Sequence, residues 1–140
     1  MNYVFFGSPE FAAIILERLI AAGMSPALVV CNPDRPLGRK KIFTFPPTKM
    51  IATKHEISVL QPESLKNFQL STFNFQLDFA VVAAYAQIIP QSVLDLPRLG
   101  TIGVHPSLLP KYRGATPIQS VILNGEIETG VTLYLMDAKM

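Results

Sequence analysis

The residues best suited to chemistry lie in a short loop that follows an apolar run late in the chain. The run, Ile102–Val104, ends at His105, and the loop after it contains Ser107, Lys111 and Arg113. Histidine titrates near neutral pH and can act as a general acid or base. In an open α/β sheet, ligands bind at the carboxyl ends of the strands, which is where this loop would begin. The pattern therefore predicts a histidine acid–base site beside cations that suit an anionic substrate. An isolated histidine, by contrast, would by default be structural and bind a loop carbonyl.

Three other chemistries do not fit the sequence. Ser107 lacks the Gly-x-Ser-x-Gly context of a serine-hydrolase elbow. Two distant histidines and one cysteine are too few for a zinc site, so we predict no metal. The turn at Gly7–Pro9 has one glycine, which matches neither the dinucleotide fingerprint nor a phosphate-binding loop. We interpret that turn as a tight connection from a strand to a helix.

A second candidate site is the basic loop Asn32–Lys41, whose prolines exclude a helix or an inner strand. The loop ends in Arg39, Lys40 and Lys41. On charge alone this composition predicts a solvated surface loop. If the strands are parallel, however, the loop shares one sheet edge with His105, which favours contacts with nucleic-acid phosphates.

A third candidate is the segment Val82–Pro90, which follows an apolar run. Its small residues Ala83, Ala84 and Ala86 would let a flat ligand approach the backbone. Close packing between a helix and the sheet explains the same residues, and on its own it is the better explanation. The adjoining histidine loop favours a ligand.

The elements that must position these residues follow from hydrophobic patterning. Continuous apolar runs predict strands that are covered on both faces, as in a parallel sheet. These runs are Tyr3–Phe6, Ala27–Cys31, Phe79–Ala84, Thr101–Val104 and Gly130–Met136, with a weaker one at Ile57–Leu60. Helical patterns alternate with them, at residues 9–22, 48–55, 91–94 and 117–124. The alternation predicts an α/β fold of the doubly wound type with a mostly parallel sheet.

Two helix starts carry capping signals. Ser8 is expected to cap the first helix, with Pro9 at its first position. Thr116-Pro-Ile-Gln119 has the pattern of a capping box. In the helix that follows, Ile118, Val121 and Ile122 are expected to face inward, with Leu123 as a further candidate.

Composition sets the remaining bounds. The chain has 140 residues, of which 49% are hydrophobic and 16% charged, which fits one globular domain. A net charge of +2 is too small to indicate nucleic-acid binding by itself. One cysteine excludes an internal disulfide and suits a reducing compartment, so we expect a cytoplasmic protein, without a leader or a membrane span. The last strand-like run is not followed by anything that closes a fold, so we expect the catalytic domain to be incomplete at its C-terminus.

Several segments of the sequence resemble the N-terminal part of the methionyl-tRNA formyltransferase family. The resemblance covers essentially all of residues 1–140 and rests on a set of motifs. These are Phe6-Gly-Ser-Pro-Glu-Phe-Ala12, Pro33-Asp-Arg-Pro-Leu-Gly-Arg39, Gln61-Pro62-Glu63, Val82-Ala-Ala-Tyr85 with Ile89-Pro90, His105-Pro-Ser-Leu-Leu-Pro-Lys-Tyr-Arg-Gly-Ala115 and Gly130-Val-Thr132. The histidine loop is shared by several folate-dependent formyltransferases, whereas the basic loop is typical of the tRNA enzyme.

The resemblance implies a Rossmann-like domain that transfers a formyl group from 10-formyltetrahydrofolate to the methionyl amino group of initiator tRNA. His105 would assist the oxyanion or the proton transfer. The basic residues would contact the tRNA acceptor end, and the protein is expected to act as a monomer. Residues implied for the folate site are Ser107, Leu108, Leu109, Pro110, Val82, Ala83, Ala84 and Tyr85, and those implied for tRNA are Arg39, Lys40 and Lys41.

Two departures from the family pattern carry consequences. Gly103 stands where the family has an asparagine, whose side chain would help hold the formyl oxygen. The family's catalytic aspartate would align directly after Met140, and the family's C-terminal tRNA-binding domain would follow further on. We therefore expect these 140 residues alone to show little activity. The alternatives are a formyltransferase acting on a sugar nucleotide or on glycinamide ribonucleotide, and a non-catalytic domain that binds folate or tRNA.

Overall fold

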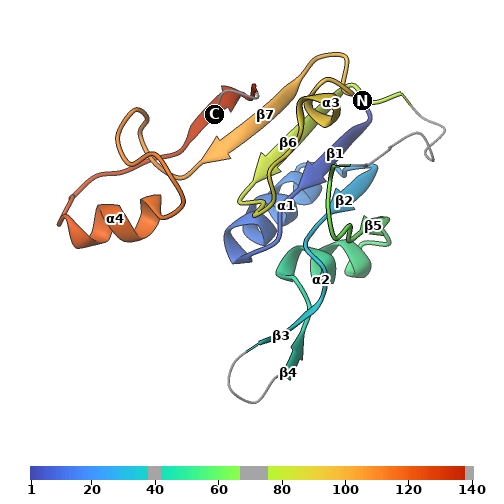
Figure 1. The fold of residues 1–140 in the computed structure, drawn as a ribbon, viewed down its shortest axis with the longest axis horizontal. Helices are drawn as coiled ribbons and strands as arrows, with labels where there is room; N and C mark the ends of the chain where they lie inside the picture. The colour runs from blue at the N-terminus through green and yellow to red at the C-terminus, as the bar shows by residue number, and fades with distance from the viewer. Residues whose placement is uncertain (38–41, 67–75, 138–140) are drawn as a thin grey trace.

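A mostly parallel six-stranded sheet forms the centre of the molecule (Figure 1). The computed structural model describes residues 1–37, 42–66 and 76–137. The strand order is β5-β2-β1-β6-β7-β8, and only β8 runs antiparallel to its neighbour. The strands are β1 (Tyr3–Phe6), β2 (Leu28–Val30), β5 (Val59–Leu60), β6 (Phe79–Ala83), β7 (Thr101–His105) and β8 (Thr132–Leu135). All six predicted strands are thus confirmed, within a few residues at their ends.

The apolar runs are continuous because both faces of the sheet are covered. In β1, Val4 and Phe6 pack into a core on one face, and Tyr3 and Phe5 pack into a second core on the other. All four side chains are at most 2% exposed. Alternate residues of a strand point to opposite faces, so a strand covered on both sides needs an apolar residue at every position.

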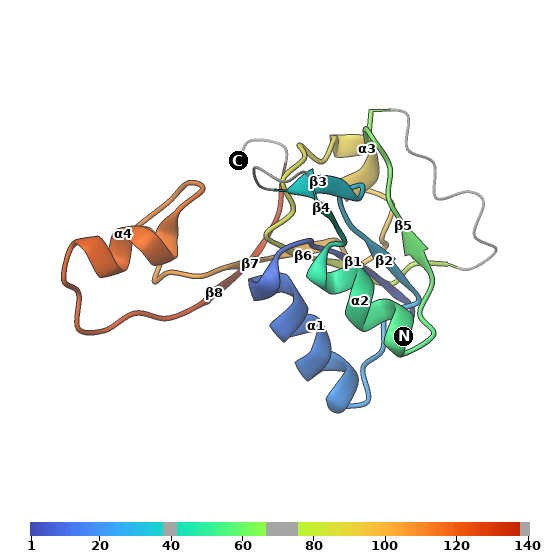
Figure 2. The same cartoon turned by 90° about the horizontal axis from the view of Figure 1, so that it is seen from below.

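The described residues form four helices beside the sheet: α1 (Glu10–Ala21), α2 (Pro47–Lys54), α3 (Gln91–Leu94) and α4 (Pro117–Leu123). Helices α1 and α2 cover one face and α3 covers the other, while α4 stands apart from the sheet beside the connection to β8 (Figure 2). Among the described residues, no helix is both long and apolar enough to cross a membrane.

The basic segment contains a strand that the sequence did not predict. β3 (Arg35–Leu37) pairs antiparallel with β4 (Ile42–Thr44) as a hairpin outside the main sheet. Pro36 has no N–H to donate, but a two-stranded ribbon has free edges where that loss is tolerated. For the described residues 32–37, the prediction that the segment forms no helix or inner strand is confirmed, and the prediction of a plain loop is wrong at residues 35–37.

Both predicted side-chain caps are wrong. The structure has Pro9 and Thr116 as the residues that precede α1 and α4, and neither helix has a side-chain cap. The Ser8 hydroxyl instead accepts a hydrogen bond of 2.9 Å from the Asn32 backbone N–H. Because that partner comes from the loop after β2, the alternative to capping could not be found from the local sequence. Pro117 does occupy the first turn of α4, as predicted.

The inward face of α4 was also partly mispredicted. Val121 is buried, but Ile118, Ile122 and Leu123 are 44%, 72% and 85% exposed. Helical spacing shows which residues share a face but not whether a second element lies against it. Here α4 stands away from the sheet, so most of its apolar stripe is uncovered.

Candidate active site

A cavity of about 670 Å³ opens where the sheet reverses its strand order, between β1 and β6. The carboxyl ends of parallel strands meet at this edge, and their crevice is the usual ligand site of such sheets. The cavity has the size of a small-molecule site. The carboxyl ends of four strands and the segments that follow them line it: Ser8 and Pro9 after β1, Asn32, Pro33 and Arg35 after β2, Ala84, Tyr85 and Ala86 after β6, and His105 and Pro106 at the end of β7.

His105 is the last residue of β7 and lies on the wall of this cavity. Its Nε2 is 2.9 Å from the backbone oxygen of Tyr112. A carbonyl can only accept a hydrogen bond, so Nε2 carries the proton and donates it. In the neutral ring, Nδ1 is then the nitrogen with a lone pair for a substrate. The Tyr112 carbonyl is the loop partner expected of a structural histidine. The same hydrogen bond keeps the proton on Nε2 and leaves Nδ1 free to accept a proton from a substrate.

The loop after His105 is held by two hydroxyl groups. Ser107 is fully buried, and its Oγ donates a 2.7 Å hydrogen bond to the backbone oxygen of Lys111. Thr132 of β8 donates from Oγ1 to the Ser107 backbone oxygen at 2.7 Å. The same Thr132 oxygen accepts the Leu109 N–H at 3.1 Å. One side chain of β8 therefore fixes two backbone groups of the histidine loop, a role that sequence reasoning missed.

We expect Thr132→Val to lower the free energy of unfolding by about 2 kcal/mol, because it leaves two backbone groups of the loop without their partner. Thr132→Ser is the matched control, since it keeps the hydroxyl and removes only a methyl group. Urea unfolding followed by circular dichroism would measure both variants. Equal midpoints for Thr132→Val and Thr132→Ser would contradict the role of the hydroxyl.

Two buried polar atoms in the cavity wall have no hydrogen-bond partner among the described residues. They are the side-chain oxygen of Asn32 and the hydroxyl of Tyr85. Burial, followed by the nearby Cys31, raises the pKa of Tyr85 to about 12, which keeps its hydroxyl protonated. The Ala84 backbone has a φ of 48° and turns the chain sharply between β6 and Tyr85. Buried polar groups are normally satisfied, so these two atoms mark positions for polar groups of a ligand.

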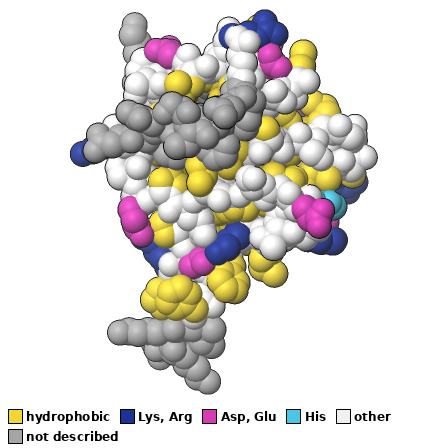
Figure 3. Space-filling model, turned by 90° about the vertical axis from the view of Figure 1, so that its right-hand side faces the viewer, with side chains coloured by type: hydrophobic (Ala, Val, Ile, Leu, Met, Phe, Trp, Pro, Cys, Tyr) yellow, Lys and Arg dark blue, Asp and Glu magenta, His cyan; other side chains and the backbone are white. Residues whose placement is uncertain are grey.

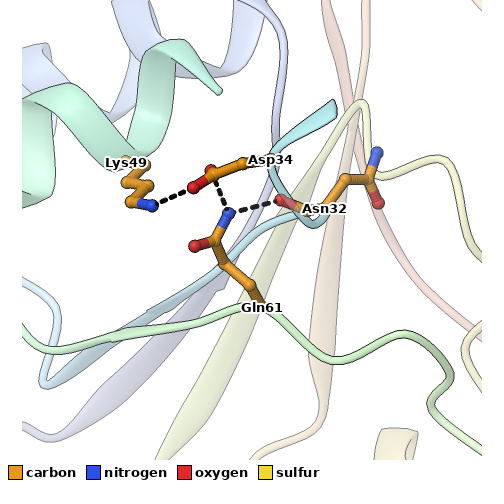
Figure 4. A network of polar contacts seen from close by, with 4 residues as sticks. All are labelled: Asn32, Asp34, Lys49 and Gln61. Carbon is orange, nitrogen blue, oxygen red and sulfur yellow. Dashed lines mark hydrogen bonds and ion pairs between the residues drawn. The ribbon is translucent and has the colours of Figure 1, made fainter. Parts of the chain in front are cut away.

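A polar network fixes the start of the β3–β4 hairpin beside the cavity (Figure 4). Gln61 donates from Nε2 to the Asn32 backbone oxygen at 2.9 Å and to the Asp34 carboxylate at 2.6 Å. Lys49 of α2 also binds Asp34, with Nζ 2.5 Å from the carboxylate. The hydrogen bonds from Gln61 and Lys49 hold the pKa of Asp34 below its usual value. The Asn32 side chain points away from this network, so its amide is left for the cavity (Figure 4).

The predicted site residues divide into three groups. Val82, Ala84, Tyr85 and His105 line the cavity. Ala83 is buried and packs on the face of the sheet opposite to Val82. Residues 107–110 lie in the histidine loop and do not line the cavity. The assignment of these residues to the folate site stays a prediction. Arg39, Lys40, Lys41 and Met140 lie outside the described residues. The predicted meeting of the histidine loop with the loop after β2 is confirmed for Asn32, Pro33 and Arg35.

The model of the formyl transferase family matches residues 1–140, the whole chain. The chain belongs to the formyl transferase family. It is 49% identical to a methionyl-tRNA formyltransferase of Halalkalibacterium halodurans, over 100% of this chain and 45% of that protein. Proteins of the same name from Staphylococcus epidermidis and Thermotoga maritima are 51% and 50% identical, each over 44% of its length. The chain thus spans about half the length of the curated relatives that it matches.

Solved structures confirm the Rossmann-like α/β fold of the family. A phosphoribosylglycinamide formyltransferase from Anaplasma phagocytophilum superposes with a TM-score of 0.71 at 17% identity, over 97% of this chain and 64% of that one. A formyltetrahydrofolate deformylase from Pseudomonas syringae superposes with a TM-score of 0.69 at 20% identity, over 98% of this chain and 46% of that one. At these identities the likeness concerns the fold and not the substrate.

Proposed function

We propose that the protein carrying this chain transfers a formyl group from 10-formyltetrahydrofolate to the methionyl amino group of initiator tRNA in the cytoplasm. The observation that carries the proposal is the 49–51% identity, across the whole chain, to proteins named methionyl-tRNA formyltransferase. A histidine with a fixed tautomer on the wall of a ligand-sized cavity agrees with acyl-type transfer.

The chemistry needs one proton relay and one site for developing negative charge. The methionyl nitrogen attacks the formyl carbon, and a new C–N bond forms while the carbonyl oxygen becomes an oxyanion. Collapse of this oxyanion breaks the bond to the folate nitrogen, which leaves with a proton. His105 would take the amine proton on Nδ1 and return it to the leaving nitrogen, while its Nε2 stays on the Tyr112 carbonyl.

The cavity suits the flat, polar-edged ring system of a folate. Its wall is mainly apolar, and the unpartnered oxygens of Asn32 and Tyr85 supply two fixed polar contacts. The exposed backbone at Ala84 would let a ring approach closely. Formyl-folate would supply the activated one-carbon group, and the chain's part is to orient it beside His105.

The hairpin β3–β4 suits a tRNA acceptor end. Phe43 and Phe45 are 65% and 50% exposed, and hydrophobic side chains gather over the hairpin at the lower end of Figure 3. Exposed aromatic rings next to cations are a common platform for single-stranded nucleic acid, because bases stack on the rings while cations meet phosphates. Arg39, Lys40 and Lys41 belong to the same segment of the sequence.

For the intact protein, we expect Arg39→Ala to raise the KM for methionyl-tRNA about tenfold and to reduce its salt dependence, because one phosphate contact is lost. The KM for the formyl donor should stay the same. Lys54→Ala is the matched control, since Lys54 is an exposed cation in the last turn of α2. Steady-state formylation at two salt concentrations would test this, and unchanged tRNA dependence would refute the assignment.

The proposed function is tested by an acceptor panel with the intact protein. Radiolabelled formyl transfer would be measured with initiator methionyl-tRNA, glycinamide ribonucleotide and an amino-sugar nucleotide in separate reactions. We expect turnover with the tRNA alone, and gel filtration should show a monomer. Transfer to one of the other acceptors would favour the alternative formyltransferases, whereas binding of folate without any turnover would identify a binding domain.

A further inference from the structure

Tyr134 of β8 covers the one glycine of β7. In the antiparallel pair the residue opposite Gly103 is Tyr134, and the residue opposite His105 is Thr132. A Cβ atom added to Gly103 would lie 2.7 Å from both Cε1 and Oη of Tyr134, and closer still to Cζ. The phenol end of Tyr134 therefore occupies the space that any side chain at position 103 would enter.

The tyrosine hydroxyl lies on the face of the sheet from which His105 emerges. Residues two apart on a strand point to the same face, as do directly paired residues, so Gly103, His105 and Tyr134 share one face. Residues i and i+2 of a strand, such as Gly103 and His105, lie about 7 Å apart. Both His105 and Tyr134 line the cavity, and a small group bound between them would be within reach of each side chain.

The hydroxyl has no partner within the part of the chain that the structure describes. Two other tyrosines do have partners, with Tyr3 donating to the Met24 carbonyl and Tyr112 to the Glu126 carboxylate. Two tyrosines line the cavity, Tyr85 and Tyr134, and of these Tyr85 has a buried hydroxyl without a partner among the described residues. Burial raises the pKa of Tyr134 above its ordinary value, so the group is a neutral donor at physiological pH.

Packing over a glycine explains an aromatic ring at position 134 but not its hydroxyl. A phenylalanine would cover Gly103 equally well, so the hydroxyl is free to serve a second purpose. A group bound in the cavity can accept a hydrogen bond from it. The carbonyl oxygen of a transferred formyl group is such an acceptor, and it gains negative charge during the reaction.

We propose that the Tyr134 hydroxyl donates a hydrogen bond to the formyl oxygen in the transition state, in the space that an amide side chain at position 103 would otherwise fill. This inference rests on the proposed function. Tyr134 keeps its proton throughout: the new bond joins the methionyl nitrogen to the formyl carbon, the bond to the folate nitrogen breaks, and the proton passes through His105. Tyr134 of β8 thus binds the formyl oxygen while His105 of β7 transfers the proton.

The first test is Tyr134→Phe in the intact protein, which keeps the ring over Gly103 and removes only the hydroxyl. We expect kcat to fall on the order of 10²-fold, with the KM values for 10-formyltetrahydrofolate and methionyl-tRNA within about twofold of wild type. The urea midpoint should not fall. Tyr3→Phe is the control, because it removes a hydroxyl from the opposite end of the sheet and should lower stability while kcat stays unchanged.

The second test exchanges the two side chains. Tyr134→Ala opens the space over position 103, and Gly103→Asn added to it places an amide donor there. We expect the double variant to recover kcat at least tenfold over Tyr134→Ala, whereas Gly103→Asn alone should lower stability, because its side chain must displace the ring of Tyr134. A merely structural tyrosine would give no such recovery.

The outcomes separate the two claims. A wild-type protein that formylates methionyl-tRNA, with Tyr134→Phe equal to it in kcat, overturns the role of the hydroxyl and leaves the proposed function standing. A change confined to KM also overturns it, since the interaction would then not be specific to the transition state. A wild-type protein without formyl transfer overturns the proposed function, and the inference with it.

Discussion

Replacing His105 with alanine should reduce kcat of the intact protein by about 10³-fold, because the proton relay between the two nitrogens loses its imidazole. The fold should survive, since the side chain is half-buried and, within the described part of the chain, makes one hydrogen bond, to the Tyr112 carbonyl. Formylation kinetics and circular dichroism of the same preparation would measure both properties.

Two further variants separate chemistry from support of the loop. His105→Gln retains an amide N–H that can reach the Tyr112 carbonyl but cannot relay a proton, so it should be as inactive as His105→Ala. His55 is the other histidine of the chain, exposed at the end of α2, and His55→Ala should be fully active. Substantial activity in His105→Gln would mean that the ring serves only to hold the loop.

The largest expected loss of stability comes from Gly7→Ala, at about 3 kcal/mol. A Cβ at this position would lie 2.6 Å from the Ala83 backbone oxygen and 2.7 Å from the Ala12 Cβ. The glycine cannot move away, because its N–H donates to the Val30 carbonyl and its own carbonyl accepts the Thr48 hydroxyl. The added methyl group would press on the Ala83 backbone, while Gly7 itself is held by hydrogen bonds of its N–H and its carbonyl. Rotating a side chain cannot relieve this overpacking.

Gly23→Ala is the matched control for this prediction. Gly23 has a φ of 77°, where alanine is strained, but nothing lies within 4 Å of an added Cβ. That substitution should cost about 1 kcal/mol, from the left-handed backbone alone. Urea unfolding of both variants would compare them, and equal losses would show that the contacts of Gly7 can relax.

The sheet was predictable because its signal is local. A strand covered on both faces needs a continuous apolar run, and even the weak run at Ile57–Leu60 contains β5. The location of the site followed from topology, since parallel strands bring the residues after β2 and β7 to one edge, and Asn32 and His105 do line one cavity. The formyl transferase family was recognised from motifs, and its match to the whole chain confirmed it.

The contacts that build the site could not be predicted, because they join residues far apart in the sequence. Thr132 fixes the backbone of Ser107 from 25 positions away, and Ser8 binds the Asn32 N–H from 24 positions away. Nothing near either residue in sequence marks these partners. The left-handed backbone at Ala84 is equally invisible, because alanine has no preference for it.

The pairing of Gly103 with Tyr134 has a consequence for how sequences of this family can diverge. A larger residue at position 103 would have to displace the ring of Tyr134, and without the ring the glycine is left uncovered on an antiparallel strand pair. A substitution at position 103 or 134 alone should therefore cost stability or activity. A lineage that changes one of the two residues is expected to change the other as well. An alignment of family members should therefore show the two columns varying together, with tyrosine at position 134 confined to sequences that have glycine at position 103.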